Sequence, residues 1–249
     1  MGTVIGTKAD VERIAAHGRT SLMMAEARGG DIAAAAAARL GPAMAEVDAA
    51  ATARKAAHDL VDTLWAAVVA EEAASDKGIG VVRDMMWNEL GRPRRSPYFD
   101  QVFPGGVTTY TDVDVRKKAL MMQVLRSRIL SGAAPGLGTA VRAEWAADIE
   151  TLRTSLDKAV AALLPAEAAA SVADAAYRLA ARLLQMRLRA FKQDLENLGV
   201  SKAHIFEIIP DAGPSTASSS SKPTNGSGPP PAGQPAPSTG LPTDTNKAA

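Results

Sequence analysis

The sequence contains no cysteine and few aromatic residues, and both shortages narrow the chemistry open to the protein. Its 249 residues include three Trp, three Tyr and four Phe. Without a thiol the chain cannot form disulfides, thiolate nucleophiles, iron–sulfur clusters or cysteine-ligated zinc sites. The scarcity of aromatic and β-branched residues argues against a β-sandwich or β-barrel, because strands favour those residues.

Neither sign of charge dominates, and no long apolar run is present. The chain has 28 Lys and Arg and 27 Asp and Glu, a formal net charge of +1. This balance gives no global attraction to nucleic acid or to an anionic membrane. The N-terminus lacks the features of a signal peptide, and the most apolar runs fall far short of the roughly 20 residues that span a bilayer. We therefore expect a cytoplasmic protein with no membrane partner.

Alanine is abundant, filling about one position in five, and it is the strongest helix former. Apolar residues recur at helical spacing almost throughout residues 9–209, which predicts an all-α fold. We expect an antiparallel bundle of long helices as the domain formed by residues 1–210. Residues 211–249 are rich in Pro, Gly, Ser and Thr and are expected to form a disordered tail.

The first half of the chain is expected to contain four helical segments. The first covers residues 9–28 and is ended by Gly29 and Gly30, and Asp31 is expected to cap a second that runs through the alanine-rich stretch as far as Gly41 and Pro42. The next long helix covers 42–74, and Ser75 or Asp76 is expected to cap a separate short helix that ends at Leu90. The expected inward face of the long helix consists of Met44, Val47, Ala51, Ala57 or His58, Val61, Trp65 and Val68.

The second half is expected to contain three more helices and a final short one. They begin near Asp112, at Thr139 and at Pro165, since proline fits the first turn of a helix, and Ser201 is expected to cap the final turn. The expected inward face of the helix that begins at Pro165 includes Val172, Ala176, Leu179, Leu183 and Met186.

No catalytic or metal-binding motif stands out. The three histidines, His17, His58 and His204, do not pair with another metal ligand at helical spacing. Asp112 and Asp114 resemble a cation site, but acidic residues also cap helix starts. The sequence has no P-loop, no dinucleotide fingerprint in a β–α–β context and no nucleophile elbow. We predict a protein that is not an enzyme and that holds no metal or cofactor.

The most distinctive segment lies in the middle of the chain. Five of the ten aromatic residues fall between Trp87 and Tyr110, in a loop broken by prolines and glycines. Eight basic and three acidic residues lie between Arg92 and Arg128. The aromatic side chains either form an exposed recognition surface or plug one end of the bundle. The candidate interaction surface comprises Arg92, Arg94, Arg95, Tyr98, Phe99, Phe103, Arg116, Lys117 and Lys118.

Two functions are compatible with this pattern. The favoured hypothesis is a non-enzymatic helical structural or protein-interaction module that binds a protein partner or self-associates through alanine-rich helix faces. The alternative is a nucleic-acid or phosphate-binding protein, in which the basic residues around Arg92–Arg95 and Arg116–Lys118 contact phosphates and the aromatic rings stack on bases. Adjacent basic and acidic helices that neutralise one another would produce the same charge pattern, and the near-zero net charge favours that simpler interpretation.

Overall fold

The computed structural model describes residues 10–131 and 137–210, which form eight helices and no strand. This confirms the predicted all-α fold of long packed helices. The expected disordered tail, residues 211–249, lies outside the described residues. The helices are α1 (Val11–Arg28), α2 (Gly30–Arg39), α3 (Gly41–Glu89), α4 (Pro97–Val102), α5 (Thr108–Thr111), α6 (Val115–Leu130), α7 (Thr139–Asn197) and α8 (Lys202–Ile208).

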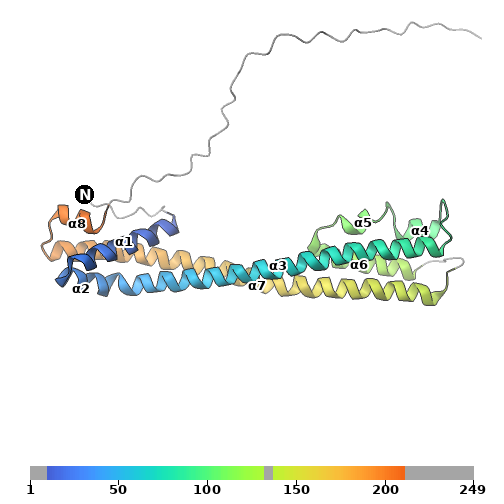
Figure 1. Ribbon diagram of the computed structural model, residues 1–249, viewed down its shortest axis with the longest axis horizontal. Coiled ribbons are helices and arrows are strands. Elements are labelled where there is room, and N and C mark those ends of the chain that lie inside the picture. Colours follow the sequence, from blue (N-terminus) through green and yellow to red (C-terminus); the bar gives the residue numbers. More distant parts are fainter. Residues whose placement is uncertain (1–9, 132–136, 211–249) are drawn as a thin grey trace, which may run out of the picture. The chain divides into compact units, whose positions relative to one another are not determined.

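The two longest helices, α3 and α7, lie side by side and run in opposite directions (Figure 1). Arg54 of α3 binds Asp174 of α7, and further along α3 Gly78 packs against Leu152 of α7. The residue numbers rise along one helix as they fall along the other, as an antiparallel pair requires. Helices α1, α2 and α8 pack at one end of the pair, and α4, α5 and α6 pack at the other.

The buried apolar residues form two separate cores, one at each end of the α3–α7 pair. We call the first the terminal core, because α1 and α8 contribute to it, and the second the loop core, because the aromatic mid-chain segment contributes to it. The terminal core includes Ile14, Leu40, Val47, Tyr177, Leu184, Phe191 and Ile205. The loop core includes Ile79, Met86, Tyr98, Phe103, Tyr110, Leu125 and Trp145.

Between the two cores lies a middle segment made of residues 55–70 of α3 and 159–174 of α7. Its buried side chains are Val68, Leu163, Ala166 and Ala170, which is a small amount of apolar burial for so long a stretch. A helix in water depends on tertiary packing of an apolar face for most of its stability. The middle segment therefore has less internal support than either end.

Two predicted helix boundaries are wrong, because close packing and exposure override the local signals. Ser75 is fully buried inside a continuous α3, and nearby Gly78 lets Leu152 of α7 approach closely. Pro165 lies inside a continuous α7 rather than at the start of a helix. The turn before it contains the exposed residues Ala161 and Ala162, so the carbonyl that proline leaves without a donor can be hydrated.

The predicted inward faces of both long helices are also partly wrong. Trp65 of α3 is 44% exposed, and Val172, Leu179 and Met186 of α7 are more than half exposed. The buried face of α7 lies on its other side and consists of Tyr177, Ala181, Leu184, Leu188, Phe191 and Leu195. Both sets recur at helical spacing, so periodicity alone could not choose between them.

Candidate interaction surface

The aromatic mid-chain segment plugs the loop core rather than forming a recognition surface. Tyr98, Phe103 and Tyr110 are buried, and the Tyr98 hydroxyl donates a hydrogen bond of 2.7 Å to the carbonyl of Ile129. The Tyr110 hydroxyl donates a 2.6 Å bond to a backbone carbonyl and accepts one from the guanidinium of Arg128. Phe99 is half-buried, and its ring centroid lies 5.4 Å from that of Phe103 in a tilted arrangement. The rings of Tyr98, Phe103 and Tyr110 are therefore not available to stack on bases.

Lys118, predicted as part of the basic surface, is fully buried. Its ammonium donates hydrogen bonds of 2.8 Å to both Glu72 and Asp76 on α3. Burial alone would lower the pKa of Lys118, but the hydrogen bonds that it donates to the two carboxylates outweigh that cost and raise its pKa above the ordinary value. The charge is thus used to attach α6 to α3 and cannot contact a phosphate.

The five remaining basic residues of the predicted surface are exposed, but two of them are held by neighbours within the chain. Arg116 binds Glu167 of α7 at 2.7 Å, and Arg92 donates to the side chain of Asn88 at 2.8 Å. Arg94, Arg95 and Lys117 are exposed on the loop and on α6. The nine predicted residues are therefore not brought into one surface, because three of them are buried and a fourth is held by an acidic neighbour.

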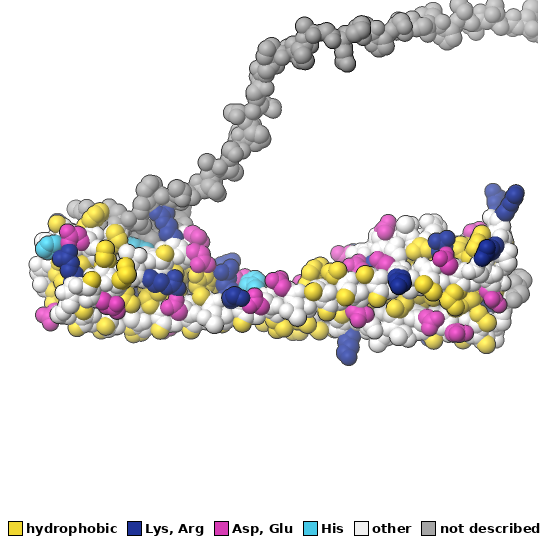
Figure 2. Space-filling view, in the orientation of Figure 1, with side chains coloured by type: hydrophobic (Ala, Val, Ile, Leu, Met, Phe, Trp, Pro, Cys, Tyr) yellow, Lys and Arg dark blue, Asp and Glu magenta, His cyan; other side chains and the backbone are white. Residues whose placement is uncertain are grey.

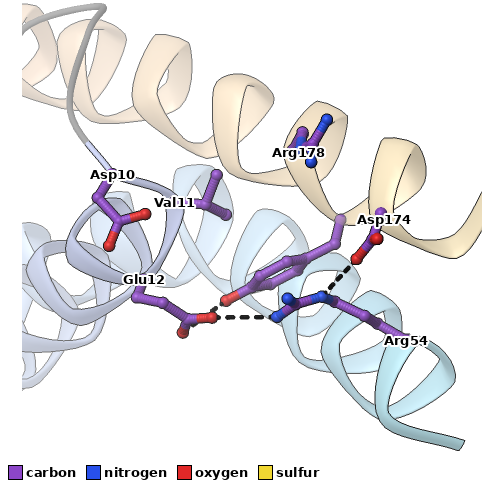
Figure 3. Close-up of a pocket in the computed structure, with 7 residues that line it drawn as sticks. Asp10, Val11, Glu12, Arg54, Asp174 and Arg178 are labelled. Carbon is purple, nitrogen blue, oxygen red and sulfur yellow. Dashed lines mark hydrogen bonds and ion pairs between the residues drawn. The ribbon is translucent and has the colours of Figure 1, made fainter. Parts of the chain in front are cut away.

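A pocket of about 230 Å³ lies where α1 meets the α3–α7 pair (Figure 3). Arg54 crosses it, donating to Asp174 at 2.6 Å and to Glu12 at 3.3 Å. The Tyr177 hydroxyl donates to the other oxygen of Glu12 at 2.9 Å, and the guanidinium of Arg54 lies 5.4 Å from the Tyr177 ring centre. His58 adds a second partner for Asp174 at 3.2 Å.

These contacts join three helices by mutual neutralisation. The hydrogen bond from Arg54, followed by that from His58, lowers the pKa of Asp174 below its ordinary value. Burial and the hydrogen bond to Glu12 raise the pKa of Tyr177. A carboxylate held ionised by a guanidinium and a phenol held protonated are poor proton-transfer groups at neutral pH. These hydrogen bonds and ion pairs hold α1 against α3 and α7.

The second pocket, of about 260 Å³, is lined by Gln123, Arg126, Glu150 and Arg153. Arg153 donates two hydrogen bonds to Glu150, of 2.7 and 3.0 Å. This hydrogen bonding is the main reason that the pKa of Glu150 lies below its ordinary value. Within the described ranges, no cluster of three or more acidic or histidine side chains is placed to hold a metal ion.

A third feature is the outward face of α7, which includes residues that were predicted to point inward. Leu164, Val172, Leu179, Leu183 and Met186 are all exposed, with Val172 at 69% and Leu179 at 58%. Successive helix residues are about 100° apart, so these five side chains fall within an arc of about 100°. Figure 2 shows hydrophobic side chains that reach the surface between charged groups on the face it presents.

Small residues complete this face into a continuous stripe. Steps of four, four and three residues repeat along α7, an 11-residue pattern typical of helix–helix seams. The sequence therefore shows two apolar faces on opposite sides of this helix, and their spacing is the signal from which an exposed apolar face could have been predicted. We call the set the outer stripe: Leu164, Ala168, Val172, Ala175, Leu179, Leu183, Met186 and Ala190.

Charged residues flank the outer stripe unevenly. Glu167 and Asp174 lie beside its first half, and Arg178, Arg182 and Arg189 lie beside its second half. Both acids are ion-paired within the chain. Those three arginines form no ion pair with any other described residue, so their charges are open to an external partner.

Among the described helices, α7 is the one that is long and apolar enough to cross a membrane by length and composition. Only 17% of its apolar 18-residue window is buried. One such helix is weak evidence for a span. Uninterrupted apolar runs do not reveal this window, because acidic residues interrupt it. Its acidic residues Glu167 and Asp174 are held by Arg116 and Arg54 in the packed fold.

Comparison with other proteins adds no relative to this description. No known protein family, curated protein or solved structure matches the chain.

Proposed function

We propose that the protein is a non-enzymatic helical interaction module whose binding surface is the outer stripe of α7. The observation that carries this proposal is the alignment of five exposed large hydrophobic side chains on one face of a rigid helix. Single exposed apolar residues are common on soluble proteins, but a contiguous apolar stripe is typical of a docking surface. The ligand that fits such a stripe is another amphipathic helix.

The rest of the architecture supports this function. The two cores fix both ends of α7, so the outer stripe lies on one continuous helix before any partner docks. The middle segment buries few of its own side chains, and a docked helix would supply the packing that it lacks.

Site-specific cross-linking in an extract of the cells that produce the protein tests the proposal. Because the chain has no cysteine, a single cysteine at Val172 or Leu179 lets the purified protein be labelled with a short photoactivatable group at that position alone before it is added to the extract. We expect both positions to form adducts with a protein, whether a second copy or another chain, because they lie at the centre of the stripe.

A matched cysteine at Thr63, which is exposed on α3, serves as the control. Adducts at Val172 and Leu179 but not at Thr63 would support the stripe as the binding surface. Equal labelling at all three positions, or protein adducts at none, would remove the basis of the proposal.

A further inference from the structure

We propose that the occupant of the outer stripe is a second copy of this chain, docked with its own α7 antiparallel to the first. This inference rests on the proposed function and specifies its partner. The two outer stripes would form a twofold-symmetric seam whose axis passes between Ala175 and Leu179. Each position then meets the position equally far on the other side of the axis.

The sizes of the residues in the stripe fit this arrangement. Antiparallel pairing about that axis places Leu164 opposite Ala190, Met186 opposite Ala168, and Leu179 opposite Ala175 of the second copy. A large residue faces a small one in all three cases, as it does where Leu183 meets Ser171, while Val172 meets the aliphatic stem of Arg182. A parallel, in-register pair would instead place each large residue opposite itself and each alanine opposite itself, which leaves alternating clashes and gaps.

The flanking charges agree with the same direction. Counted about this axis, Glu167 lies two residues from Arg189 of the second copy and Asp174 lies two residues from Arg182, and symmetry doubles each pairing. Both acids already bind arginines within the chain, and carboxylate oxygens accept several hydrogen bonds, so both can be shared. Arg178 lies near its own copy at the axis and is exposed.

The size of the stripe predicts a weak dimer. From Leu164 to Ala190 the stripe is about 40 Å long at 1.5 Å per residue. A single helix face of that length buries less than the roughly 1,200 Å² of a standard stable interface. We therefore expect dimers that form at high protein concentration and dissociate on dilution.

Cysteine cross-linking between two variants of the full-length chain tests the direction. One carries Ala168→Cys and the other carries Met186→Cys with a size tag, and both positions are exposed. The mixture is oxidised at high concentration, where the dimer is populated. Antiparallel docking predicts the mixed disulfide in excess of either self-disulfide by at least about 10-fold, because only facing cysteines meet the Cα separation limit near 7 Å.

Each other outcome overturns the inference. Self-disulfides in excess would show parallel docking, since the two positions are about 27 Å apart along the helix. No disulfide, with the protein bound instead to vesicles of anionic phospholipid, would identify a lipid surface as the occupant. A monomer that forms no disulfide, while the labelled stripe captures a different protein in the cell extract, would refute the second copy and leave the proposed function standing.

Discussion

Helices α3 and α7 each expose five large hydrophobic side chains, yet they present very different surfaces. Those of α3 are Leu60, Trp65, Val69, Val81 and Met85, and they are distributed around most of the helix circumference. Those of α7 fall on one face. The same number of exposed large hydrophobic side chains is ordinary when scattered and forms a docking stripe when aligned. The position of the residues, rather than their number, distinguishes the two helices.

The first way to break this comparison is to place charge on the two helices at equivalent positions. We expect Val172→Glu combined with Leu179→Glu to weaken self-association more than 100-fold, because docking would move four carboxylates from water into an apolar seam. The folded monomer should be little changed, since both positions are exposed. Sedimentation velocity measures the association, and circular dichroism checks the helix content.

The matched control is Leu60→Glu combined with Val69→Glu on α3, which are 51% and 47% exposed. This variant should associate as the unaltered chain does. An equal loss of association in both variants would show that exposed apolar surface of any kind drives the contact, and the distinction between the two helices would fail.

The second prediction concerns the buried contact between Lys118 of α6 and the acidic residues Glu72 and Asp76 of α3. Lys118→Met should lower the free energy of unfolding by about 2 kcal/mol, less than the 3–5 kcal/mol for a fully buried pair, because Glu72 and Asp76 remain partly hydrated. Adding Glu72→Gln and Asp76→Asn should recover most of that loss. Urea unfolding measures all three variants, and a triple variant as unstable as Lys118→Met alone would refute the account of this contact.

The third prediction compares two glycines, Gly18 and Gly78, that pack against side chains of α7. A methyl group on Gly18 would lie 2.7 Å from Leu184 on the buried face and 2.9 Å from the sulfur of Met44. Overpacking there should outweigh the helix propensity gained, so Gly18→Ala should destabilise the fold by about 1 kcal/mol.

Gly78→Ala is the comparison for that variant. Its methyl group would meet the end of Leu152, a half-buried side chain that can move. The effect should therefore lie within about 0.5 kcal/mol of zero, because the gain in helix propensity offsets the contact. Thermal unfolding would contradict this account if Gly78→Ala were the more destabilising of the two.

The smallest expected effect is on pH dependence in the terminal core. His17 is buried and its Nε2 lies 3.0 Å from the carbonyl oxygen of Pro210, while its Nδ1 has no hydrogen-bond partner among the residues that the structure describes. Burial, followed by the positive charge of Arg13, lowers the pKa of His17 below the ordinary 6.5. The unfolded chain binds the proton first, so the contribution of His17 is present above pH 6.5 and is lost as pH falls through the folded pKa.

We therefore expect the melting temperature to fall on acidification from pH 7.5 to 5.5 by more in the unaltered chain than in His17→Gln, which cannot be protonated. An identical fall in both proteins would mean that His17 does not contribute to the acid sensitivity of this end.

Much of the fold could be predicted from the sequence, because alanine content and helical spacing act locally. Gly29, with φ of 71°, ends α1 as expected, and Ser201 caps α8. Ser75 and Pro165 misled the prediction because their effect depends on tertiary context: one is packed against a neighbouring helix and the other is exposed to water.

The candidate site was predicted less well, for two physical reasons. Aromatic rings near arginines suit either a core or a surface, and only the packing of Tyr98 and Phe103 decides between them. On α7, two apolar sets occupy opposite faces, and which of them turns inward depends on where α1 and α3 dock. Lys118 resembled a surface charge because its partners Glu72 and Asp76 are distant in sequence.

The most direct test of the central claim is sedimentation velocity of the unaltered chain over about 5 to 500 μM, a range that covers weak protein–protein affinities. Self-docking through the outer stripe predicts that the mean mass rises with concentration from the 25.8 kDa of one chain toward twice that value. A single monomeric species across the whole range would contradict it.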